Sequence, residues 1–258
     1  RYYGDANPAL TYTVGGKGLV NDDTLSGALT TAATVTSNVG DYAITQGTLA
    51  ASDNYAITYV GANLSVTPRP LTVTYTANPA SRSFGDPNPA LSGSVSSSGL
   101  VNDDELGGTA VWTTPATPGS GVGRYAINGS GIAASGNYEL TSVQAPGNAT
   151  ALTITPRAVT VVYTANPVSR SYGNANPLLA GSYTVQGLVG GDARGGSLRW
   201  TTTAGGSTGV GSYAITGSGL FAGGNYALSS VQAQSNATAL TITPRAIAVN
   251  AYAKVRNY

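Results

Sequence analysis

The clearest feature of the sequence is a set of short runs in which apolar and polar residues alternate. Residues 71–76 read Leu-Thr-Val-Thr-Tyr-Thr, and residues 159–164 read Val-Thr-Val-Val-Tyr-Thr. A period of two places Leu71, Val73 and Tyr75 on one face of a strand. We therefore expect a half-buried β-strand at each of these places.

Five further types of run return at similar intervals, and each type is expected to form one strand per repeat. They cover residues 10–14, 91–95 and 183–185; the strands that carry Leu29, Trp112 or Trp200; the Val-Gly-x-Tyr-Ala-Ile motif at 39–44, 122–127 and 210–215; the strands that begin with Asn-Tyr at 54–55, 137–138 and 225–226; and the closing runs at 64–67, 152–155 and 240–243. Pro68, Pro156 and Pro244 end the closing runs, because proline lacks the donor that a ladder needs. These prolines predict short, stiff junctions.

A six-residue marker sets the frame of these runs and identifies the chain as a tandem repeat. Its glycines, Gly4, Gly85 and Gly173, are 81 and 88 residues apart, so each unit has the size of a small domain. We expect a turn at each marker, because Gly supplies positive φ and Asp or Asn forms an Asx-turn. The marker residues to which we assign this structural role are Tyr3, Gly4, Pro8, Phe84, Gly85, Pro89, Tyr172, Gly173 and Pro177.

The frame divides the chain into repeat 1 at residues 1–69, repeat 2 at 70–157, repeat 3 at 158–245 and a remainder at 246–258. Repeat 1 lacks a counterpart of the opening strand of the other two. Residues 246–252 resemble that strand and would begin a fourth repeat, in which residues 256–258 restart the marker. We expect an all-β chain of three compact two-layer domains, of Ig-like or β-grasp-like character, arranged end to end as a rod.

Composition narrows the classes of function. The chain has 12 Lys and Arg against 11 Asp and Glu and is only 9% charged, so we do not expect nucleic acid as a partner. No uninterrupted apolar stretch reaches the roughly 18 residues of a membrane span, so we expect a soluble segment without membrane insertion. Cys, His and Met are absent, which removes disulfides, thiolate and imidazole ligands and the commonest general base. We therefore expect neither an enzyme nor a cofactor.

Acidic loops follow a Gly-Leu-Val motif in repeats 1 and 2. Their carboxylates, which are weak candidates for calcium, are Asp22, Asp23, Asp103, Asp104 and Glu105. Calcium needs six to eight oxygens, no EF-hand spacing is present, and repeat 3 has Gly-Gly before a single Asp in this loop. A solvated turn explains the acidic loops better than a calcium site.

Trp112 and Trp200 could stack on sugar rings, but Leu29 occupies the equivalent position in repeat 1. A position that accepts both Trp and Leu is typical of the core, because the two side chains share burial and not stacking chemistry.

Three arginines and two sequons complete the set of candidates. Arg1, Arg82 and Arg170 stand two residues before each marker aromatic, and we expect them to lie against that ring or to pair with a carboxylate. Asn148 and Asn236 begin Asn-Ala-Thr sequons, which we expect in surface loops where N-glycosylation is feasible in a secreted form.

Taken together, the Tyr-Gly-Asp-x-Asn-Pro marker, the Gly-Leu-Val-Asn-Asp loop, Val-Gly-x-Tyr-Ala-Ile, Asn-Tyr and the closing Leu-x-Val/Ile-Thr-Pro-Arg resemble the MBG domain of the YGX type. The resemblance covers essentially the whole chain. That family occurs in arrays in large bacterial surface proteins, many of them similar to filamentous haemagglutinin-like, two-partner-secreted adhesins. The resemblance implies a β-rich module at the cell surface and supplies no catalytic residue.

Three hypotheses for function follow. The repeats could form a stalk that presents the binding tip of an adhesin, or they could bind a host or biofilm glycan or protein through Tyr-rich loops. Alternatively, residues 246–258 of one chain could complete the open edge of repeat 1 in another and build a filament. All three place the chain outside the cell or on the bacterial surface, with neighbouring repeats of the same or an identical chain as its first partners.

Overall fold

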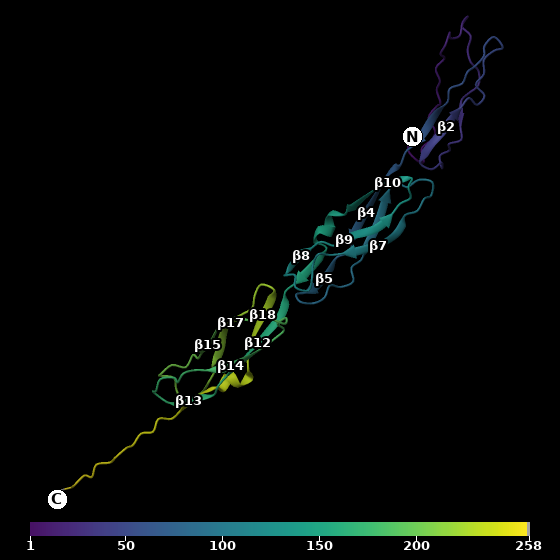
Figure 1. Cartoon of the computed structure of the whole chain (residues 1–258). Helices are drawn as coiled ribbons and strands as arrows, with labels where there is room; N and C mark the ends of the chain where they lie inside the picture. Colours follow the sequence, from purple (N-terminus) through teal and green to yellow (C-terminus); the bar gives the residue numbers. More distant parts are fainter. Residues whose placement is uncertain (257–258) are drawn as a thin grey trace. The chain divides into compact units, whose positions relative to one another are not determined.

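The computed structural model describes residues 1–256 and contains no α-helix among them (Figure 1). Short β-strands and two 3-10 helices make up its regular structure, so the all-β fold class predicted from the alternating runs is confirmed. No helix within the described residues is long and apolar enough to cross a bilayer. Asn257 and Tyr258, with which the marker restarts in the sequence, lie outside the described residues.

Repeat 2 is built on a three-stranded sheet with β4 (Arg69–Ala77) at its centre. β6 (Gly93–Ser98) pairs with β4 in the antiparallel sense, and β10 (Tyr138–Gln144) pairs with it in the parallel sense. Leu71, Val73 and Tyr75 are buried, as the alternation in this strand predicts. The central strand therefore supplies much of the core of the repeat.

Further small sheets complete repeat 2. β7 (Gly107–Thr113) pairs antiparallel with β9 (Asn128–Ala133). A second three-stranded sheet has the order β5 (Ala80–Ser83), β11 (Leu152–Thr155) and β8 (Gly123–Tyr125). The 3-10 helix η1 (Pro146–Thr150) leads into β11.

Repeat 3 has the same set of elements. Its central strand β12 (Arg157–Ala165) lies between β14 (Gly181–Gln186) and β18 (Tyr226–Gln232). The remaining elements are β13 (Val168–Ser171), β15 (Gly195–Thr201), β16 (Gly211–Tyr213), β17 (Thr216–Phe221), η2 (Gln234–Thr238) and β19 (Leu240–Thr243).

The two tryptophans pack within these sheets. Trp112 meets Tyr75 edge to face with ring centroids 6.0 Å apart, and Trp200 meets Tyr163 in the same way at 6.2 Å. This packing agrees with the core role that the exchange with Leu29 predicts.

Repeat 1 differs, because it contains only one sheet, with the order β1 (Thr30–Thr31), β2 (Gly40–Thr45) and β3 (Ala62–Val66). The strands predicted at residues 10–14 and from Asn54 are absent, so this part of the prediction is wrong. Their counterparts in repeat 2, β6 and β10, both pair with β4, and residues 1–69 contain no such central strand. Without that partner, the alternating residues have no ladder to join.

Residues 246–252 likewise form no strand, although their pattern matches the central strands. The segment that follows β19 is exposed, with Ile247, Val249 and Tyr252 all more than four-fifths accessible to solvent. A strand exists only with a ladder partner, and this segment has none in the described chain.

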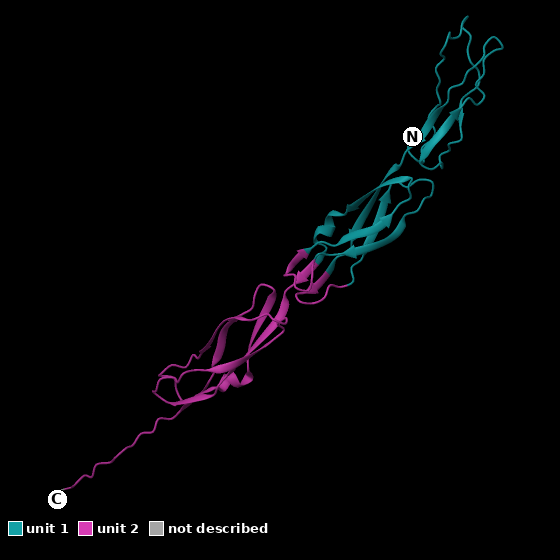
Figure 2. Cartoon of the chain, viewed as in Figure 1, with its two compact units in different colours: residues 1–80, 90–115, 125–152 teal, residues 81–89, 116–124, 153–258 magenta. Residues whose placement is uncertain are grey.

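The chain forms two compact units, and the division between them passes through repeat 2 (Figure 2). One unit holds residues 1–80, 90–115 and 125–152, and the other holds residues 81–89, 116–124 and 153–258. The residues that join repeat 1 to repeat 2 all belong to the first unit, and those that join repeat 2 to repeat 3 belong to the second. All the contacting residues of a given junction therefore lie within one unit.

Candidate functional site

The marker forms a tight turn in every repeat, as predicted. Gly4, Gly85 and Gly173 have φ of 80°, 84° and 84°, in the left-handed region that favours glycine. The backbone N–H of Asp5 donates to the carbonyl of Tyr2 at 3.2 Å, and the same bond recurs in the other two repeats. The positive φ of the turn explains why the marker contains glycine. The marker also takes part in the contacts between repeats.

The arginine that precedes each marker is bound by neutral oxygens. Arg82 is only 7% exposed and donates from Nε to Asn88 Oδ1 at 2.8 Å and from Nη2 to the Thr117 carbonyl at 2.5 Å. Arg170 repeats this arrangement with Asn176 and the Gly205 carbonyl. The prediction of an aromatic or carboxylate partner is wrong, because the marker asparagine and loop carbonyls provide the acceptors.

In repeat 1, Arg1 donates from Nη2 to the Thr34 carbonyl at 2.5 Å, and Asn7 donates to the Ala33 carbonyl at 2.7 Å. The arginine and the marker asparagine thus hold the same loop in all three repeats. Neither is available for an external anion in repeats 2 and 3, where the guanidinium is buried.

A second arginine, from the closing Pro-Arg, fastens each repeat to the next. Arg69 donates from Nε to the Tyr3 carbonyl at 2.7 Å and forms an ion pair with Asp5. Arg157 donates to the Phe84 carbonyl at 3.2 Å and pairs with Asp86 at 2.6 Å. The acidic residue of the marker therefore binds the first residue of the next central strand.

The aromatic residue of the marker packs on the next repeat. The rings of Tyr3 and Tyr138 meet edge to face at 5.5 Å, and those of Phe84 and Tyr226 at 5.4 Å. Tyr3 is 4% exposed and Phe84 is 7% exposed, so both rings are buried at the junction. These edge-to-face pairs add about 0.5–1.5 kcal/mol to the burial of the two rings.

The marker glycine also allows a close approach by the next repeat. A Cβ on Gly4 would lie 2.4 Å from a methyl group of Val101, and one on Gly85 would lie 2.3 Å from a methyl group of Val189. Both valines belong to the Gly-Leu-Val loops. Glycine is thus required at the marker both by its φ and by the side chain of the next repeat.

A side-chain amide completes each junction. Asn137 accepts a hydrogen bond from the Val39 backbone N–H at 3.0 Å, and Asn225 accepts one from the Val122 N–H at 2.9 Å. These asparagines come from the Asn-Tyr motif of the following repeat. The two junctions therefore share an ion pair, an aromatic pair, a valine contact and an amide bond.

The acidic loops bind a tyrosine hydroxyl of their own repeat. Asp23 accepts from the hydroxyl of Tyr55 at 2.7 Å, and Asp104 accepts from that of Tyr138 at 2.7 Å. In repeat 3 the single carboxylate, Asp192, accepts from Tyr226 in the same way. This shared bond explains why repeat 3 retains one Asp where the other loops have more.

These contacts raise the pKa of the three tyrosine hydroxyls. Burial and the hydrogen bond to Asp104 raise the pKa of Tyr138, although the Val101 amide opposes the shift by donating to the hydroxyl. The pKa of Tyr226 is raised for the same two reasons, burial first and Asp192 second. The Val20 amide lowers the pKa of Tyr55, but the bond to Asp23 and desolvation outweigh it and the net direction is upward. All three hydroxyls are held in the protonated form, in which they can donate to the carboxylate.

The rest of each acidic loop is a turn. Asn21 and Asp22 have φ of 55° and 58°, and Asn102 and Asp103 have φ of 57° and 60°. Asn and Asp tolerate this left-handed conformation better than most residues, and in repeat 3 Gly191, with a φ of 93°, takes the place of Asp103. Within residues 1–256 no group of three His, Cys, Asp or Glu is placed to hold a metal ion. Glu105 takes part in none of the tyrosine bonds described above.

The two equivalent sequons are buried, so the prediction that they lie in surface loops is wrong. Asn148 and Asn236 are each 2% exposed and lie in the 3-10 helices. Asn148 accepts from the Ala77 N–H at 2.8 Å and donates to the Tyr75 carbonyl at 3.0 Å. In the folded chain this amide nitrogen is used to tie η1 to β4 and is not open to glycosylation.

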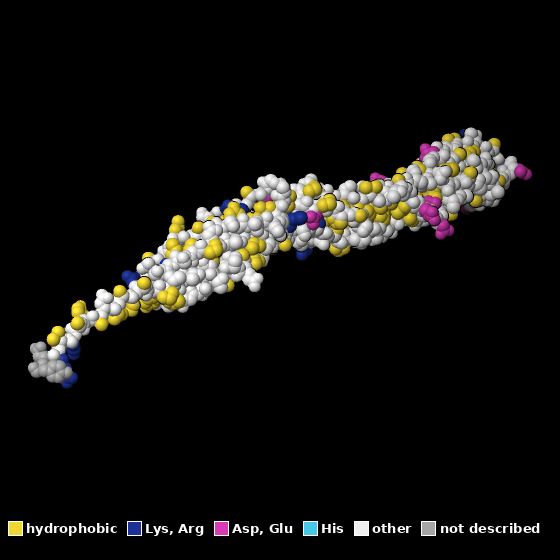
Figure 3. All heavy atoms as spheres, turned by 90° about the horizontal axis from the view of Figure 1, so that it is seen from below, with side chains coloured by type: hydrophobic (Ala, Val, Ile, Leu, Met, Phe, Trp, Pro, Cys, Tyr) yellow, Lys and Arg dark blue, Asp and Glu magenta, His cyan; other side chains and the backbone are white. Residues whose placement is uncertain are grey.

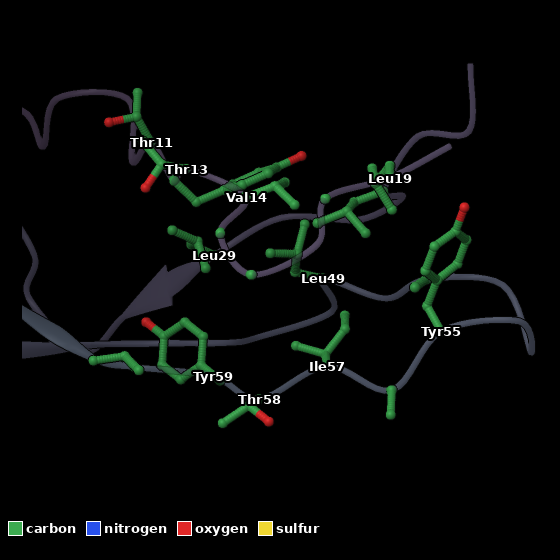
Figure 4. Close-up of a pocket in the computed structure, with 18 of the residues that line it drawn as sticks. Thr11, Thr13, Val14, Leu19, Leu29, Leu49, Tyr55, Ile57, Thr58 and Tyr59 are labelled. Atoms are coloured by element: carbon green, nitrogen blue, oxygen red, sulfur yellow. The ribbon is translucent and has the colours of Figure 1, made fainter. Parts of the chain in front are cut away.

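A groove opens in repeat 1 between the segments that correspond to β6 and β10. It has a volume of about 960 Å³, and Figure 4 shows Val14, Leu29, Leu49, Ile57 and Tyr59 among the side chains around it. Its walls come from residues 11–19 and 55–60, the counterparts of the strands that flank β4 in repeat 2. Apolar and polar side chains both line this groove, and the two segments beside it have no ladder partner in the described chain.

The sequence alone does not indicate the contacts of four junction residues. Arg69, Arg157, Asn137 and Asn225 differ from other polar residues only in that they recur with the repeat frame. Their recurrence at a fixed distance from each marker was the available signal, because side chains that repeat with the frame are expected either in the core or at the contact between repeats.

The model of one family, the MBG domain (YGX type), matches residues 1–65, 73–150 and 159–238. No curated protein and no solved structure matches the chain.

Proposed function

The chain belongs to the MBG domain (YGX type) family, and on that basis we propose that it is a non-enzymatic repeat region of a bacterial surface or secreted adhesin. In this proposal the repeats act as an extended stalk or fibre that presents a binding tip. Their partners are neighbouring repeats, and the tip supplies any contact with a host or biofilm glycan or protein.

The observation that carries the proposal is the junction, which is built twice from the same four contacts. A stalk holds its tip away from its base only if its modules resist bending where they meet. Arg69 and Arg157, which begin the central strands of the following repeats, each hold a marker, and an edge-to-face aromatic pair joins the same two repeats. A junction of this kind restricts rotation more than the flexible linker that usually separates independent domains.

Small-angle X-ray scattering on the monomer tests the stalk. A single compact domain of this length would have a radius of gyration of about 18 Å. The proposal requires a much larger value that stays unchanged over a wide range of salt. A radius near the compact value, or a broad distribution that signals freely moving repeats, would reject it.

The location is tested separately, on cells of the organism that makes the chain. Antibodies raised against these repeats should label intact cells or the culture medium, and protease added outside should remove the signal. Labelling that appears only after lysis would contradict the surface assignment.

A further inference from the structure

We propose that repeats 2 and 3 bear tension along the chain, through a row of hydrogen bonds that joins the first strands of each repeat to its last strands. We call this row the tension clamp. In repeat 3, which lies whole within one unit, it joins residues 157–172 to residues 225–243. The proposal goes beyond the stalk, because the stalk concerns the chain at rest and the clamp concerns the force at which a repeat unfolds when its ends are pulled.

The path of the force follows from the short connection between repeats. β11 ends at Thr155 and β12 begins at Arg157, so only Pro156 separates the last strand of repeat 2 from the first strand of repeat 3. One residue spans at most about 3.6 Å, so this connection has no slack to take up a pull. Tension on the chain therefore enters repeat 3 at the start of β12 and leaves it at the end of β19.

Inside repeat 3 the first and last segments of the chain run in the same direction. β12 pairs with β18 in the parallel sense over seven residue pairs. β13, which follows β12, pairs with β19 in the parallel sense over four residue pairs. Figure 1 shows β13 at the end of the repeat from which the chain leaves. Pulling on the start of β12 and on the end of β19 would therefore slide these two segments past each other.

The row of hydrogen bonds runs the whole length of both segments. It begins where the Arg157 N–H donates to the Asn225 carbonyl at 3.0 Å. It ends where the Tyr172 N–H donates to the Thr243 carbonyl at 2.9 Å. The two parallel ladders lie between these bonds, so both ends of the repeat are held by the same pair of segments.

The parallel arrangement determines how the bonds share the load. When two parallel strands are pulled from opposite ends, the force acts along the strands and all the bonds of the ladder resist it together. When the strands are pulled apart from the same end, the nearest bond breaks first and the others follow in turn. Bonds that must break together give a higher barrier to forced unfolding than the same bonds broken one by one.

The clamp is also shielded from water. Tyr163 of β12 and Leu240 and Ile242 of β19 are almost fully buried. Between the two ladders, the buried side chain of Asn236 accepts from the Ala165 N–H at 2.7 Å and so bridges the step from one sheet to the other. Sliding must therefore move buried side chains out of the core before water can replace these bonds.

The load is carried by uncharged groups. β18 and β19 are described in full and contain no charged residue, so no ion pair joins them to β12 or β13. Figure 3 shows how few charged side chains lie on the visible surface of the molecule. Salt screens interactions between charges, so the force that unfolds repeat 3 should not depend on ionic strength.

Repeat 2 contains the equivalent row. The Arg69 N–H donates to the Asn137 carbonyl at 2.9 Å, and the Phe84 N–H donates to the Thr155 carbonyl at 2.9 Å. β4 and β10 are parallel over seven residue pairs, as β12 and β18 are. The same response to tension is therefore expected from both repeats.

Single-molecule pulling between introduced cysteines tests the proposal, because the sequence contains no cysteine of its own. In the sliding geometry, the full chain is pulled at Ala158→Cys, near the start of β12, and at Ala246→Cys, beyond the end of β19. In the peeling geometry, it is pulled at Ala158→Cys and Gly224→Cys, which lie at the same end of the β12–β18 pair. All three residues are exposed, and nothing lies within 4 Å of an added Cβ at Gly224.

We expect the sliding geometry to require at least about twofold more force than the peeling geometry at the same loading rate. Both variants should keep the urea midpoint of wild type, so the difference would come from the direction of the pull and not from stability. Each sliding event should release the whole repeat, which is about 300 Å long when fully extended.

Two outcomes overturn the proposal. Equal forces in the two geometries would show that the parallel ladders do not resist the pull together. A sliding force that falls as the salt concentration rises would show that charged groups, and not the buried row, carry the load. Neither outcome changes the radius of gyration of the unloaded monomer, so the clamp and the stalk are tested separately.

Discussion

Replacing Asn148 by Ala is expected to destabilise repeat 2 strongly and to leave repeat 3 unchanged. The Asn148 side chain accepts from the Ala77 N–H at 2.8 Å and donates to the Tyr75 carbonyl at 3.0 Å and to Gln144 Oε1 at 2.9 Å. The residue is 2% exposed, so water does not reach these groups in its place. The variant would leave the Ala77 N–H at the end of β4 buried without a partner, whereas the Tyr75 carbonyl still accepts from the Ala145 N–H at 2.8 Å.

A buried donor or acceptor that loses its partner costs about 1–3 kcal/mol. One such group at the end of β4 gives a loss of about 1–3 kcal/mol in the free energy of opening of repeat 2. Asn236 makes the same bonds in repeat 3, to the Ala165 N–H and the Tyr163 carbonyl, and provides an internal reference in the same molecule.

Hydrogen exchange read by mass spectrometry suits this measurement, because a tandem array need not unfold in a single transition. Peptides that cover β4 and η1 should exchange at least about fivefold faster in Asn148→Ala, and peptides that cover β12 and η2 should be unaffected. Asn236→Ala should give the reciprocal pattern. A change of less than about twofold in the exchange rate of the β4 peptide would show that water binds the Ala77 N–H in the variant, and the argument from burial would then be wrong.

Three further predictions concern the junction, the tyrosines and close packing. Tyr3→Ala should destabilise the first junction by about 3–5 kcal/mol, whereas Asp5→Asn should cost less than about 1 kcal/mol because its ion pair with Arg69 is partly exposed. Limited proteolysis at increasing salt concentration compares the two variants. Equal sensitivity of both variants to the protease would contradict this ranking. The raised pKa of Tyr138 means that the unfolded chain loses this proton first, so its contribution to stability is complete below the ordinary value of 10.0 and is lost as the pH rises through the folded pKa. Urea titrations of wild type and Tyr138→Phe should therefore converge as the pH rises, and parallel curves would refute the linkage. Gly129→Ala should destabilise repeat 2 by about 1–3 kcal/mol, because the added Cβ would clash with Tyr75 of the central strand. Gly136→Ala is the control: nothing lies within 4 Å of its added Cβ, so its stability should stay within about 0.5 kcal/mol of wild type or rise slightly. Equal shifts in the melting temperature of the two variants would contradict the steric argument.

The sequence predicts most where the determining contacts are local or repeat with the frame. The alternation in residues 71–76 placed Leu71, Val73 and Tyr75 in the core, and β4 confirms it. Residues 10–14 have the same kind of pattern but form no strand, because a strand depends on a partner that may be distant in sequence or absent. Periodicity reports which face would be buried and does not report whether the neighbour is there.

The candidate site was harder to predict, because its partners are backbone atoms or belong to another repeat. Arg82 was expected beside an aromatic ring or a carboxylate, yet its guanidinium binds Asn88 and the Thr117 carbonyl. Every residue has a backbone carbonyl, so the sequence does not show which one accepts a hydrogen bond from Arg82. Likewise Asn148 has the pattern of a sequon and the surroundings of a buried structural amide, and only the fold distinguishes the two.

Each junction joins the marker of one repeat to the Gly-Leu-Val loop and the Asn-Tyr motif of the next. Gly4 meets Val101 and Gly85 meets Val189, so the same pair of surfaces meets at both junctions. Unequal recombination between copies in the gene could therefore add or remove whole repeats without creating a mismatched contact. The number of repeats can therefore change among descendants of such a gene while every interface keeps the same contacts. The length of the protein can evolve in this way without any change in the fold of its repeats.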